Sequence, residues 1–328
     1  MRIGIFSTFD VKCGIASYTK QLADELDALG HDLTIFCNYN LNNHKDVDFG
    51  VEYETYPCYE WYGETNKKSW DINSELLESF DVLHIQYESW LWAEDYFRNI
   101  PAEVPIVVTF HSSCISPAFI QYINSIENQV VCLTHHNVGC PGFNVRRIPM
   151  PILRQTEVEI PFAAKKNRLF SFGLGRNNDK FCLEALSILK DKFGVEVEYV
   201  TEYSTRNKWY SDEELGHMIN DSKFVALMYP ATGAEVSSSA VCRALTYKSL
   251  VFVSNTKWFE HVAGNDNVKG VDTPEKMAEH MGLAFAYNSI ADYSNSVLPE
   301  GQEYTPPVST MTEFVDKHLE IYQEVADD

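Results

Sequence analysis

The sequence predicts an α/β protein made of two doubly wound domains, and three observations lead to this prediction. Short apolar runs rich in Val, Ile and Phe alternate with longer amphipathic stretches, which is typical of parallel strands joined by crossover helices. The chain has 328 residues, enough for two domains of about 150 residues each. It is 45% hydrophobic and 22% charged, so it is too apolar for a disordered protein.

The first half of the chain contains one complete series of strands and helices. We expect a strand at residues 2–7, a loop at 8–14, and a helix from about 15 to 29 that Gly30 closes in a left-handed conformation. The later strands of this half are expected at 32–37, 82–86, 106–110, 129–133 and 145–148. This series predicts a Rossmann-like domain over residues 1–155.

A second series follows residues 154–166, which show no sustained period and indicate an interdomain connection. Its strands are expected at 168–173, 195–201, 224–228 and 249–254, and its helices near 179–192, 211–220, 238–247 and 274–287. These elements predict a second Rossmann-like domain over residues 156–308. Apolar residues at helical spacing predict a final helix within 309–325. Because such domains bind ligands at the carboxyl ends of their strands, we expect the two to face a central cleft.

The composition disfavours several classes of protein. There are 26 Lys and Arg against 47 Asp and Glu, a net charge of −21 that opposes unspecific binding to nucleic acid or to anionic membranes. No apolar run approaches the roughly 20 residues that a membrane span needs, and the first residues do not read as a secretory signal. The eight cysteines form no Cys-x-x-Cys pair. We therefore expect a cytoplasmic protein with reduced cysteines, without a membrane span and without a zinc site.

Four short segments carry residues suited to binding or catalysis. Gly14 lies where the first strand turns into its helix, and a glycine there lets backbone amides approach an anion, although a plain turn explains it equally well. Arg176 and Lys180 follow a strand and two glycines, and their charges suit a diphosphate, unless both are solvated loop residues. Glu235 precedes three serines, 237–239, that open a helix and could act only as caps.

The fourth segment contains His111, and three further histidines lie in or after predicted strands. His111 directly follows the strand at 106–110, where an imidazole could bond a hydroxyl or titrate near neutral pH, or serve only as hydrogen-bonded structure. His84 lies inside a strand, and His135 and His136 follow another, so we interpret all three as structural. Spacings typical of metal ligands are sparse, and we interpret the two examples, Asp46 with Asp48 and Glu214 with His217, as solvated surface. No Gly-x-Ser-x-Gly nucleophile motif is present.

In chain order, these segments resemble the glycosyltransferases of family 4, a large retaining family of GT-B fold that uses nucleotide-sugar donors. Residues 13–19, Cys-Gly-Ile-Ala-Ser-Tyr-Thr, are similar to the family's first glycine loop, with Gly14 as the matching glycine. The most specific segments are 211–215, 226–230, 233–240, 250–254 and 258–260, which follow one another in the order seen in a subset of these enzymes. Several linked motifs in the correct order are far more specific than one.

The resemblance implies a role for each candidate residue. His111 takes the place of a histidine that contacts the donor sugar, Arg176 and Lys180 match the pair that holds the diphosphate, and Glu235 matches the first of two glutamates separated by seven residues. The second position carries Arg243, which cannot accept hydrogen bonds from ribose hydroxyls, so the ribose contacts must differ. The expected catalytic residues are His111, Glu235, Arg176 and Lys180, and the expected donor-binding residues are Gly14, Gly175, Arg176, Lys180, Tyr229, Glu235, Ser237, Ser238, Ser239 and Arg243.

The implied reaction is transfer of a sugar from a nucleoside-diphosphate sugar to an acceptor hydroxyl, with retention and without a metal or other cofactor. The protein would act by positioning and charge stabilisation. The resemblance also implies that the last helix, about 309–328, packs back on the first domain. The expected acceptor is a soluble glycan or a small molecule.

Other functions stay open. A degenerate GT-B protein that binds a nucleotide or sugar without turnover would account for Arg243, and a sugar-nucleotide epimerase or phosphorylase would share the fold. A modified DNA base is possible as acceptor, despite the acidic total, because six cations could form a local basic strip: Arg146, Arg147, Arg154, Lys165, Lys166 and Arg168.

Overall fold

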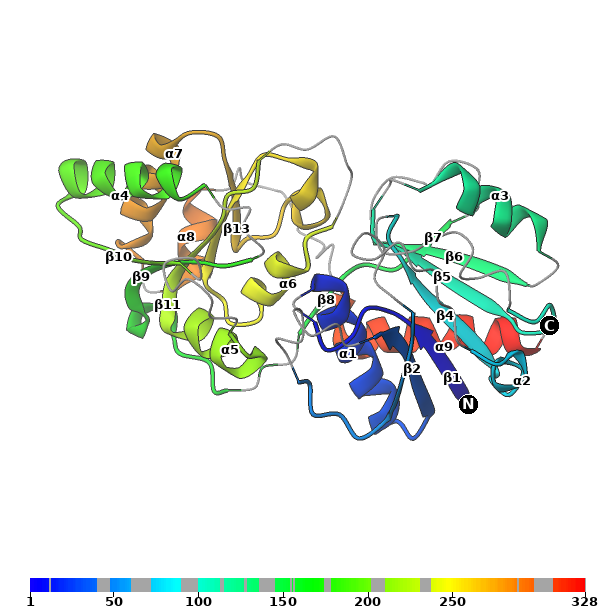
Figure 1. Ribbon diagram of the computed structural model, residues 1–328. Coiled ribbons are helices and arrows are strands. Elements are labelled where there is room, and N and C mark those ends of the chain that lie inside the picture. Colours follow the sequence, from blue (N-terminus) through cyan, green and yellow to red (C-terminus); the bar gives the residue numbers. More distant parts are fainter. Residues whose placement is uncertain are drawn as a thin grey trace. The chain divides into compact units, whose positions relative to one another are not determined.

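The chain forms two compact units, each with its own sheet (Figure 1). The first contains Met1–Pro149 and Thr312–Asp328, and the second contains Met150–Gly233 and Ser237–Met311. The computed structural model describes residues 1–11, 13–39, 48–59, 72–89, 100–112, 115–126, 129–135, 145–153, 155, 157–173, 178–201, 210–230, 237–287, 289–297 and 309–327.

The described part of the first unit holds a seven-stranded parallel sheet of order β3-β2-β1-β4-β5-β6-β7. The chain begins in the middle of the sheet, moves outward to β3, and returns to β4 on the other side of β1. Ligands of doubly wound sheets bind beyond the carboxyl ends of the strands where this order reverses, here between β1 and β4. The strands are β1 (Arg2–Phe6), β2 (Asp32–Asn38), β3 (Glu54–Tyr59), β4 (Val82–Tyr87), β5 (Ile106–Phe110), β6 (Val130–Thr134) and β7 (Val145–Arg147).

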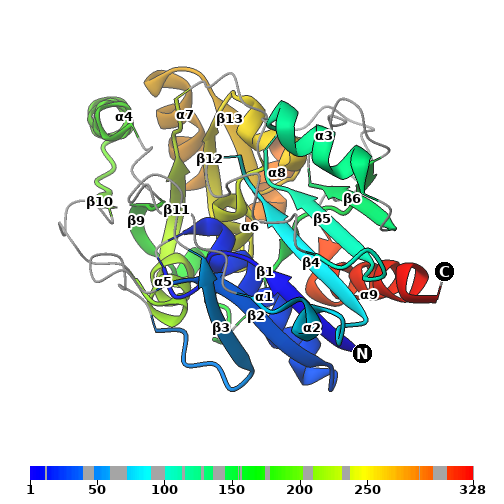
Figure 2. The same ribbon diagram turned by 45° about the vertical axis from the view of Figure 1, so that its right-hand side comes forward.

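Helices cover both faces of this first sheet (Figure 2). They are α1 (Gly14–Ala28), α2 (Ser74–Leu77), α3 (Pro117–Ser125) and the C-terminal α9 (Met311–Asp327). Phe119 and Ile123 of α3 join the apolar core on one face, whereas Tyr18 of α1 and Tyr322 of α9 contact histidines on the other. Gly30 follows α1 with φ of 83°, as expected for the residue that turns the chain towards β2.

The second unit holds a five-stranded parallel sheet of order β10-β9-β11-β12-β13 among its described residues. This is the other common doubly wound order, and it reverses between β9 and β11. The strands are β9 (Lys166–Ser171), β10 (Glu198–Thr201), β11 (Ser222–Leu227), β12 (Leu250–Ser254) and β13 (Val268–Val271), and a short separate pair joins β8 (Pro151–Ile152) to β14 (Ser309–Thr310).

The helices of the second unit begin at recognisable capping residues. Ser211 and Glu214 form a reciprocal capping box at the start of α5, and Thr273 caps α7 ahead of a proline. Residues of α4, α7 and α8 form the core on one face of the sheet. The elements are α4 (Asp179–Phe193), α5 (Asp212–Asp221), α6 (Ser239–Leu245), α7 (Pro274–Ala284), α8 (Ile290–Val297) and the 3₁₀ segments η2 (Phe162–Ala164) and η4 (Lys257–Val262).

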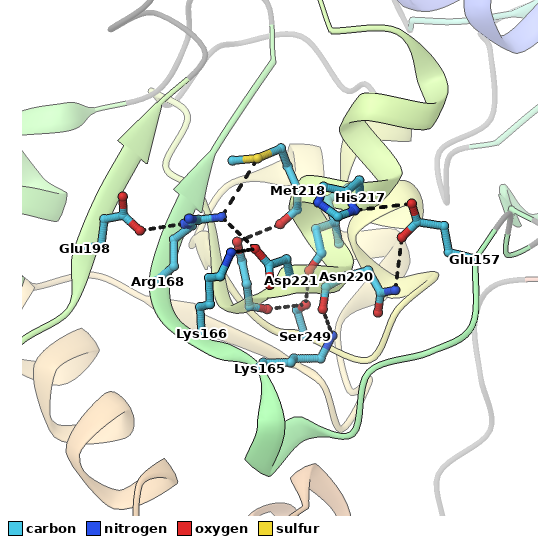
Figure 3. A network of polar contacts seen from close by, with 12 residues as sticks. Glu157, Lys165, Lys166, Arg168, Glu198, His217, Met218, Asn220, Asp221 and Ser249 are labelled. Carbon is cyan, nitrogen blue, oxygen red and sulfur yellow. Dashed lines mark hydrogen bonds and ion pairs between the residues drawn. The ribbon is translucent and has the colours of Figure 1, made fainter.

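A polar network joins the end of α5 to the beginnings of β9 and β11 (Figure 3). Arg168 Nη1 donates to Asp221 Oδ2 at 3.2 Å, and Lys166 Nζ lies 2.6 Å from the same oxygen. Lys165 is buried, donates to the Asn220 carbonyl at 2.5 Å, and has its pKa lowered to about 8 by burial. This network stabilises the amino edge of the sheet, opposite the edge where ligands bind.

The α/β class and the two doubly wound sheets are confirmed. The differences from the expected elements concern one edge strand and several short elements. Each strand expected from an apolar run is present within a few residues of its expected bounds. The edge strand β3 has no counterpart among the expected strands, because Pro57 and polar neighbours interrupt its pattern; an edge strand tolerates a proline. The structure also adds α3, β13 and α8, where short or mixed patterns indicated no element.

Candidate functional site

In the second unit, Gly173 and Tyr229 meet where the strand order reverses. Gly173 follows β9 with φ of 108°, a conformation that favours glycine. A Cβ at this position would lie 2.7 Å from the Tyr229 hydroxyl oxygen. The glycine therefore lets the tyrosine that follows β11 lie against the loop after β9.

Replacing Gly173 by alanine is expected to destabilise the second unit by about 2 kcal/mol, because the new methyl group combines an unfavourable φ with a clash. Urea unfolding measures this cost. Gly194 is the matched control, since it also has a positive φ of 66° but no atom within 4 Å of the place that a new methyl group would take, so Gly194→Ala should cost less. Equal costs for the two variants would show that the Tyr229 contact is unimportant.

Lys180 lies at the N-terminus of α4 on the same edge. Asn178 joins the start of α4 to the end of β11, since its amide donates to the Met228 carbonyl at 2.9 Å and its side chain accepts from Phe181 N at 3.2 Å. Lys180, the second residue of the helix, is exposed, and no carboxylate among the described residues pairs with it. A cation in the first turn opposes the helix dipole, and a bound anion would offset this repulsion.

The serines before α6 differ from their expected role as caps. Ser238 is the N-cap residue, but its side chain makes no capping hydrogen bond, so side-chain capping does not explain Ser238. Its amide donates to the Trp258 carbonyl at 3.1 Å and is already hydrogen-bonded. Ser237 is half-buried before it, and Ser239 is exposed as the first residue of the helix.

Aromatic rings pack against one another at this edge of the second unit. The Tyr229 ring packs perpendicular to Trp258, with 5.7 Å between centroids, and lies 5.1 Å from the Phe259 ring. Ser254 Oγ donates to the Tyr229 carbonyl at 2.7 Å. A pocket of about 460 Å³ lies beside these residues and is lined in part by Ser254, Thr256, Lys257, Phe259 and Glu260.

Arg243, which occupies the position of the family's second glutamate, forms an ion pair with Asp212. Its Nη1 lies 2.6 Å from Asp212 Oδ1, and the Arg243 side chain is only 12% exposed. The pair joins α6 to the first residue of α5. Two of the four expected catalytic residues, Arg176 and Glu235, lie outside the described residues, as does Gly175.

In the first unit, His111 directly follows β5, next to the end of β4. It is 9% exposed, and its Nε2 donates to Gln86 Oε1 at 2.8 Å. The Tyr18 ring packs perpendicular to the imidazole, with 5.1 Å between centroids. Next to this pair, Ser112 Oγ donates to Glu88 Oε1 at 2.8 Å, which joins the ends of β5 and β4 a second time. Gln86 and Glu88 are not among the candidates that the sequence indicates.

A row of polar side chains leads from His111 into the sheet. His84 is fully buried, with Nδ1 2.6 Å from the Tyr322 hydroxyl and Nε2 2.7 Å from Thr109 Oγ1. His135 is bonded through Nδ1 to the Ile148 carbonyl at 2.8 Å. The structural interpretation of His84 and His135 is thus confirmed. His84 and Gln86 alternate with apolar residues along one strand. Because central parallel strands are usually apolar throughout, this pattern in the sequence could have indicated the polar row.

Gly14 is the first residue of α1, and Cys13 before it is the N-cap residue. The glycine φ is not in the positive range, so the helix start does not require glycine for conformational reasons. Cys13 provides no side-chain cap. The start of α1 therefore leaves its first-turn amides without the usual side-chain partner.

Three of the six cations of the predicted basic strip pair with carboxylates, and Arg147 is exposed. Arg146 forms a close bidentate pair with Glu324 of α9, and Arg168 pairs with both Glu198 and Asp221. Lys165 and Lys166 belong to the network of Figure 3, and Arg154 lies outside the described residues. These ion pairs reduce the positive charge that the strip offers to a phosphate. Among the helices of the described ranges, none is long and apolar enough to cross a bilayer.

Comparison with known families matches residues 13–141 to Glycosyltransferase Family 4. This segment contains the glycine loop and His111. No curated protein sequence matches the chain. The resemblance to glycosyltransferase family 4 is confirmed over residues 13–141.

Solved structures with little sequence identity share the fold over nearly the whole chain. Sucrose-phosphate synthase from Thermosynechococcus elongatus has a TM-score of 0.60 at 12% identity, covering 99% of both chains. WaaG, a glycosyltransferase involved in lipopolysaccharide biosynthesis, has a TM-score of 0.59 at 12% identity and covers 98% of this chain and 99% of its own. An alpha-glucosyltransferase in complex with UDP-glucose and DNA containing an abasic site has a TM-score of 0.61 at 12% identity, with the same coverage. The GT-B fold class is thereby confirmed.

Proposed function

We propose that this chain, a GT-B protein whose residues 13–141 match Glycosyltransferase Family 4, transfers a sugar from a nucleoside-diphosphate donor to an acceptor hydroxyl. The observation that carries the proposal is the placement of Lys180. It is exposed in the first turn of α4, at the carboxyl edge of the second sheet, in a chain of net charge −21. The helix start and the ammonium group together suit the diphosphate of a nucleotide sugar.

The reaction would proceed with retention. The bond between the anomeric carbon and the diphosphate oxygen breaks, the acceptor oxygen bonds that carbon on the same face, and its proton passes to the departing phosphate. Lys180 would stabilise the charge that develops on the diphosphate, together with Arg176, whose role rests on the resemblance. Glu235 would bond the donor sugar, and His111 would hold the reacting sugar in position.

Charge stabilisation by these cations supports a reaction that needs no metal. For the acceptor we propose a soluble glycan or small molecule, since the net charge is −21 and three of the six cations that could contact a DNA backbone are paired with carboxylates. A cytoplasmic location stays a prediction.

Thermal unfolding with a panel of UDP, GDP, ADP, CMP and dTDP, with and without Mg²⁺, tests the donor site. UDP comes first because the alpha-glucosyltransferase was solved with UDP and with UDP-glucose. One diphosphate at about 100 times its Kd should stabilise the protein by about 2.7 kcal/mol and raise its Tm by a few degrees without Mg²⁺. Lys180→Ala should weaken this binding on the order of tenfold, because one charged hydrogen bond is lost.

Lys190→Ala is the matched control, because Lys190 is an exposed lysine in the last turn of the same helix and pairs with Glu196. It should leave the affinity unchanged. If no diphosphate shifts the wild-type Tm, the donor proposal is wrong. If a diphosphate binds but no nucleotide sugar is consumed with any acceptor, the protein is a binder without turnover.

A further inference from the structure

Gln86 hydrogen-bonds the His111 imidazole from the interior of the first unit. The two side chains lie on the same face of neighbouring strands, since Gln86 pairs with Thr109 in the β4–β5 register and His111 comes two residues later. Gln86 is fully buried, and its Oε1 lies 2.8 Å from His111 Nε2. A carbonyl oxygen can only accept a hydrogen bond, so this contact requires the proton on Nε2.

The orientation of the Gln86 amide is itself determined by His84. Gln86 Nε2 lies 3.3 Å from Nδ1 and 3.2 Å from Nε2 of the His84 ring. Both ring nitrogens already bond hydroxyl groups, those of Tyr322 and Thr109, and the amide nitrogen is almost equally distant from the two. The amide nitrogen therefore lies across the face of the imidazole, where an N–H group is attracted and a carbonyl oxygen is repelled. A flipped amide, with its oxygen over His84, is disfavoured.

We propose that Gln86 is a positioning residue that holds His111 in one tautomer, with the proton on Nε2 and the lone pair on Nδ1. A chain of polar contacts connects Tyr322 of α9 to His111 through His84 and Gln86. The C-terminal helix therefore takes part in aligning a residue at the carboxyl edge of the sheet. The functional consequence of this alignment rests on the proposed function, in which His111 positions the reacting sugar. The tautomer itself follows from the hydrogen bonds and does not depend on the proposed function.

Among the described residues, several polar or aromatic groups lie near the His111 imidazole. They are Gln86 from β4, Tyr18 from α1 and His135 after β6, while His84 is coupled to His111 electrostatically. Gln86 is neutral and hydrogen-bonds the ring directly. A change of charge at residue 86 should therefore act on His111 more strongly than a change elsewhere in the cluster.

Nitrogen NMR of the histidine side chains tests the proposal without any activity assay. Long-range ¹H–¹⁵N spectra distinguish the two tautomers, and His111→Asn identifies the His111 signals. The wild type should show a proton on Nε2, and Gln86→Leu should give an averaged mixture of tautomers. Gln86→Glu, which preserves the shape, should raise the pH at which His111 titrates by about one unit or more, because a carboxylate favours the imidazolium ion. A proton on Nδ1 in the wild type, or unchanged signals in both variants, would overturn the proposal.

Kinetics then separates this inference from the proposed function. Gln86→Leu should lower kcat on the order of tenfold while the donor KM changes little, because the loss concerns alignment of the reacting group. Ser249→Ala is the control for loss of a buried hydroxyl: Ser249 Oγ lies 2.9 Å from two carbonyl oxygens at the amino edge of the second unit. It should leave the His111 signals and kcat unchanged. If the wild type turns over no donor, the proposed function fails while the NMR result still decides the role of Gln86.

Discussion

Replacing His84 by leucine is expected to lower the free energy of unfolding of the first unit by about 3 to 5 kcal/mol. The histidine is fully buried in a central strand and bonds the hydroxyl groups of Tyr322 and Thr109. Leucine has similar volume but no polar atom, so both hydroxyls would lose their partner at about 1 to 3 kcal/mol each. Urea unfolding with hydrogen-exchange pulse labelling measures the effect, because peptides of β4 and α9 report on the first unit alone.

A double-mutant cycle with Tyr322→Phe separates the lost hydrogen bond from a general packing defect. In the wild type, Tyr322→Phe should destabilise the protein, since it leaves His84 Nδ1 without its partner at 2.6 Å. In the leucine variant the same change should cost almost nothing, because it removes a hydroxyl that is already unsatisfied. Additive costs would contradict the hydrogen-bonded arrangement.

Much of the fold could be predicted because it depends on local patterns. Apolar runs such as Ile106–Phe110 are recognisable without knowledge of their neighbours, and that strand has the expected bounds. The left-handed Gly30 after α1 was predictable for the same reason. Pairing with neighbours decides the other cases: β3 is a strand because it pairs with β2 at the sheet edge, despite Pro57.

The candidate site shows the same division. The positions of Lys180 and His111 at strand ends followed from the predicted elements, since the carboxyl ends of parallel strands share one edge. The hydrogen-bond and ion-pair partners of polar residues near the site could not be predicted, because the partners are distant in sequence. Arg243 pairs with Asp212 across 31 positions, and His84 bonds Tyr322 across 238. Nothing local in the sequence indicates either contact, and both change how the neighbouring residues are interpreted.

Acid is expected to destabilise the first unit well above the pH at which carboxylates titrate. His318 on α9 is fully buried, with Nδ1 bonded to the Phe314 carbonyl at 2.8 Å and Nε2 3.4 Å from the Tyr18 hydroxyl. Burial lowers the His318 pKa to about 4. The His84 pKa is also lowered, first by burial and then by the charges that His318, His111 and His135 would carry. Both rings are therefore neutral in the folded protein at neutral pH.

The sign of the effect follows from the lowered pKa values. Between about pH 6.5 and pH 4 the unfolded chain binds a proton at His318 that the folded chain does not, so stability is complete above pH 6.5 and is lost as the pH falls. The loss from His318 alone should reach about 2 kcal/mol at pH 5 and about 3 kcal/mol at pH 4. Urea midpoints of β4 and α9 peptides at pH 7, 6 and 5 measure it. His318→Gln, which cannot titrate, should flatten this dependence. His217→Gln removes an exposed histidine of the second unit and should leave it unchanged. Equal slopes for all three proteins would mean that the histidine on α9 is not held neutral by the fold.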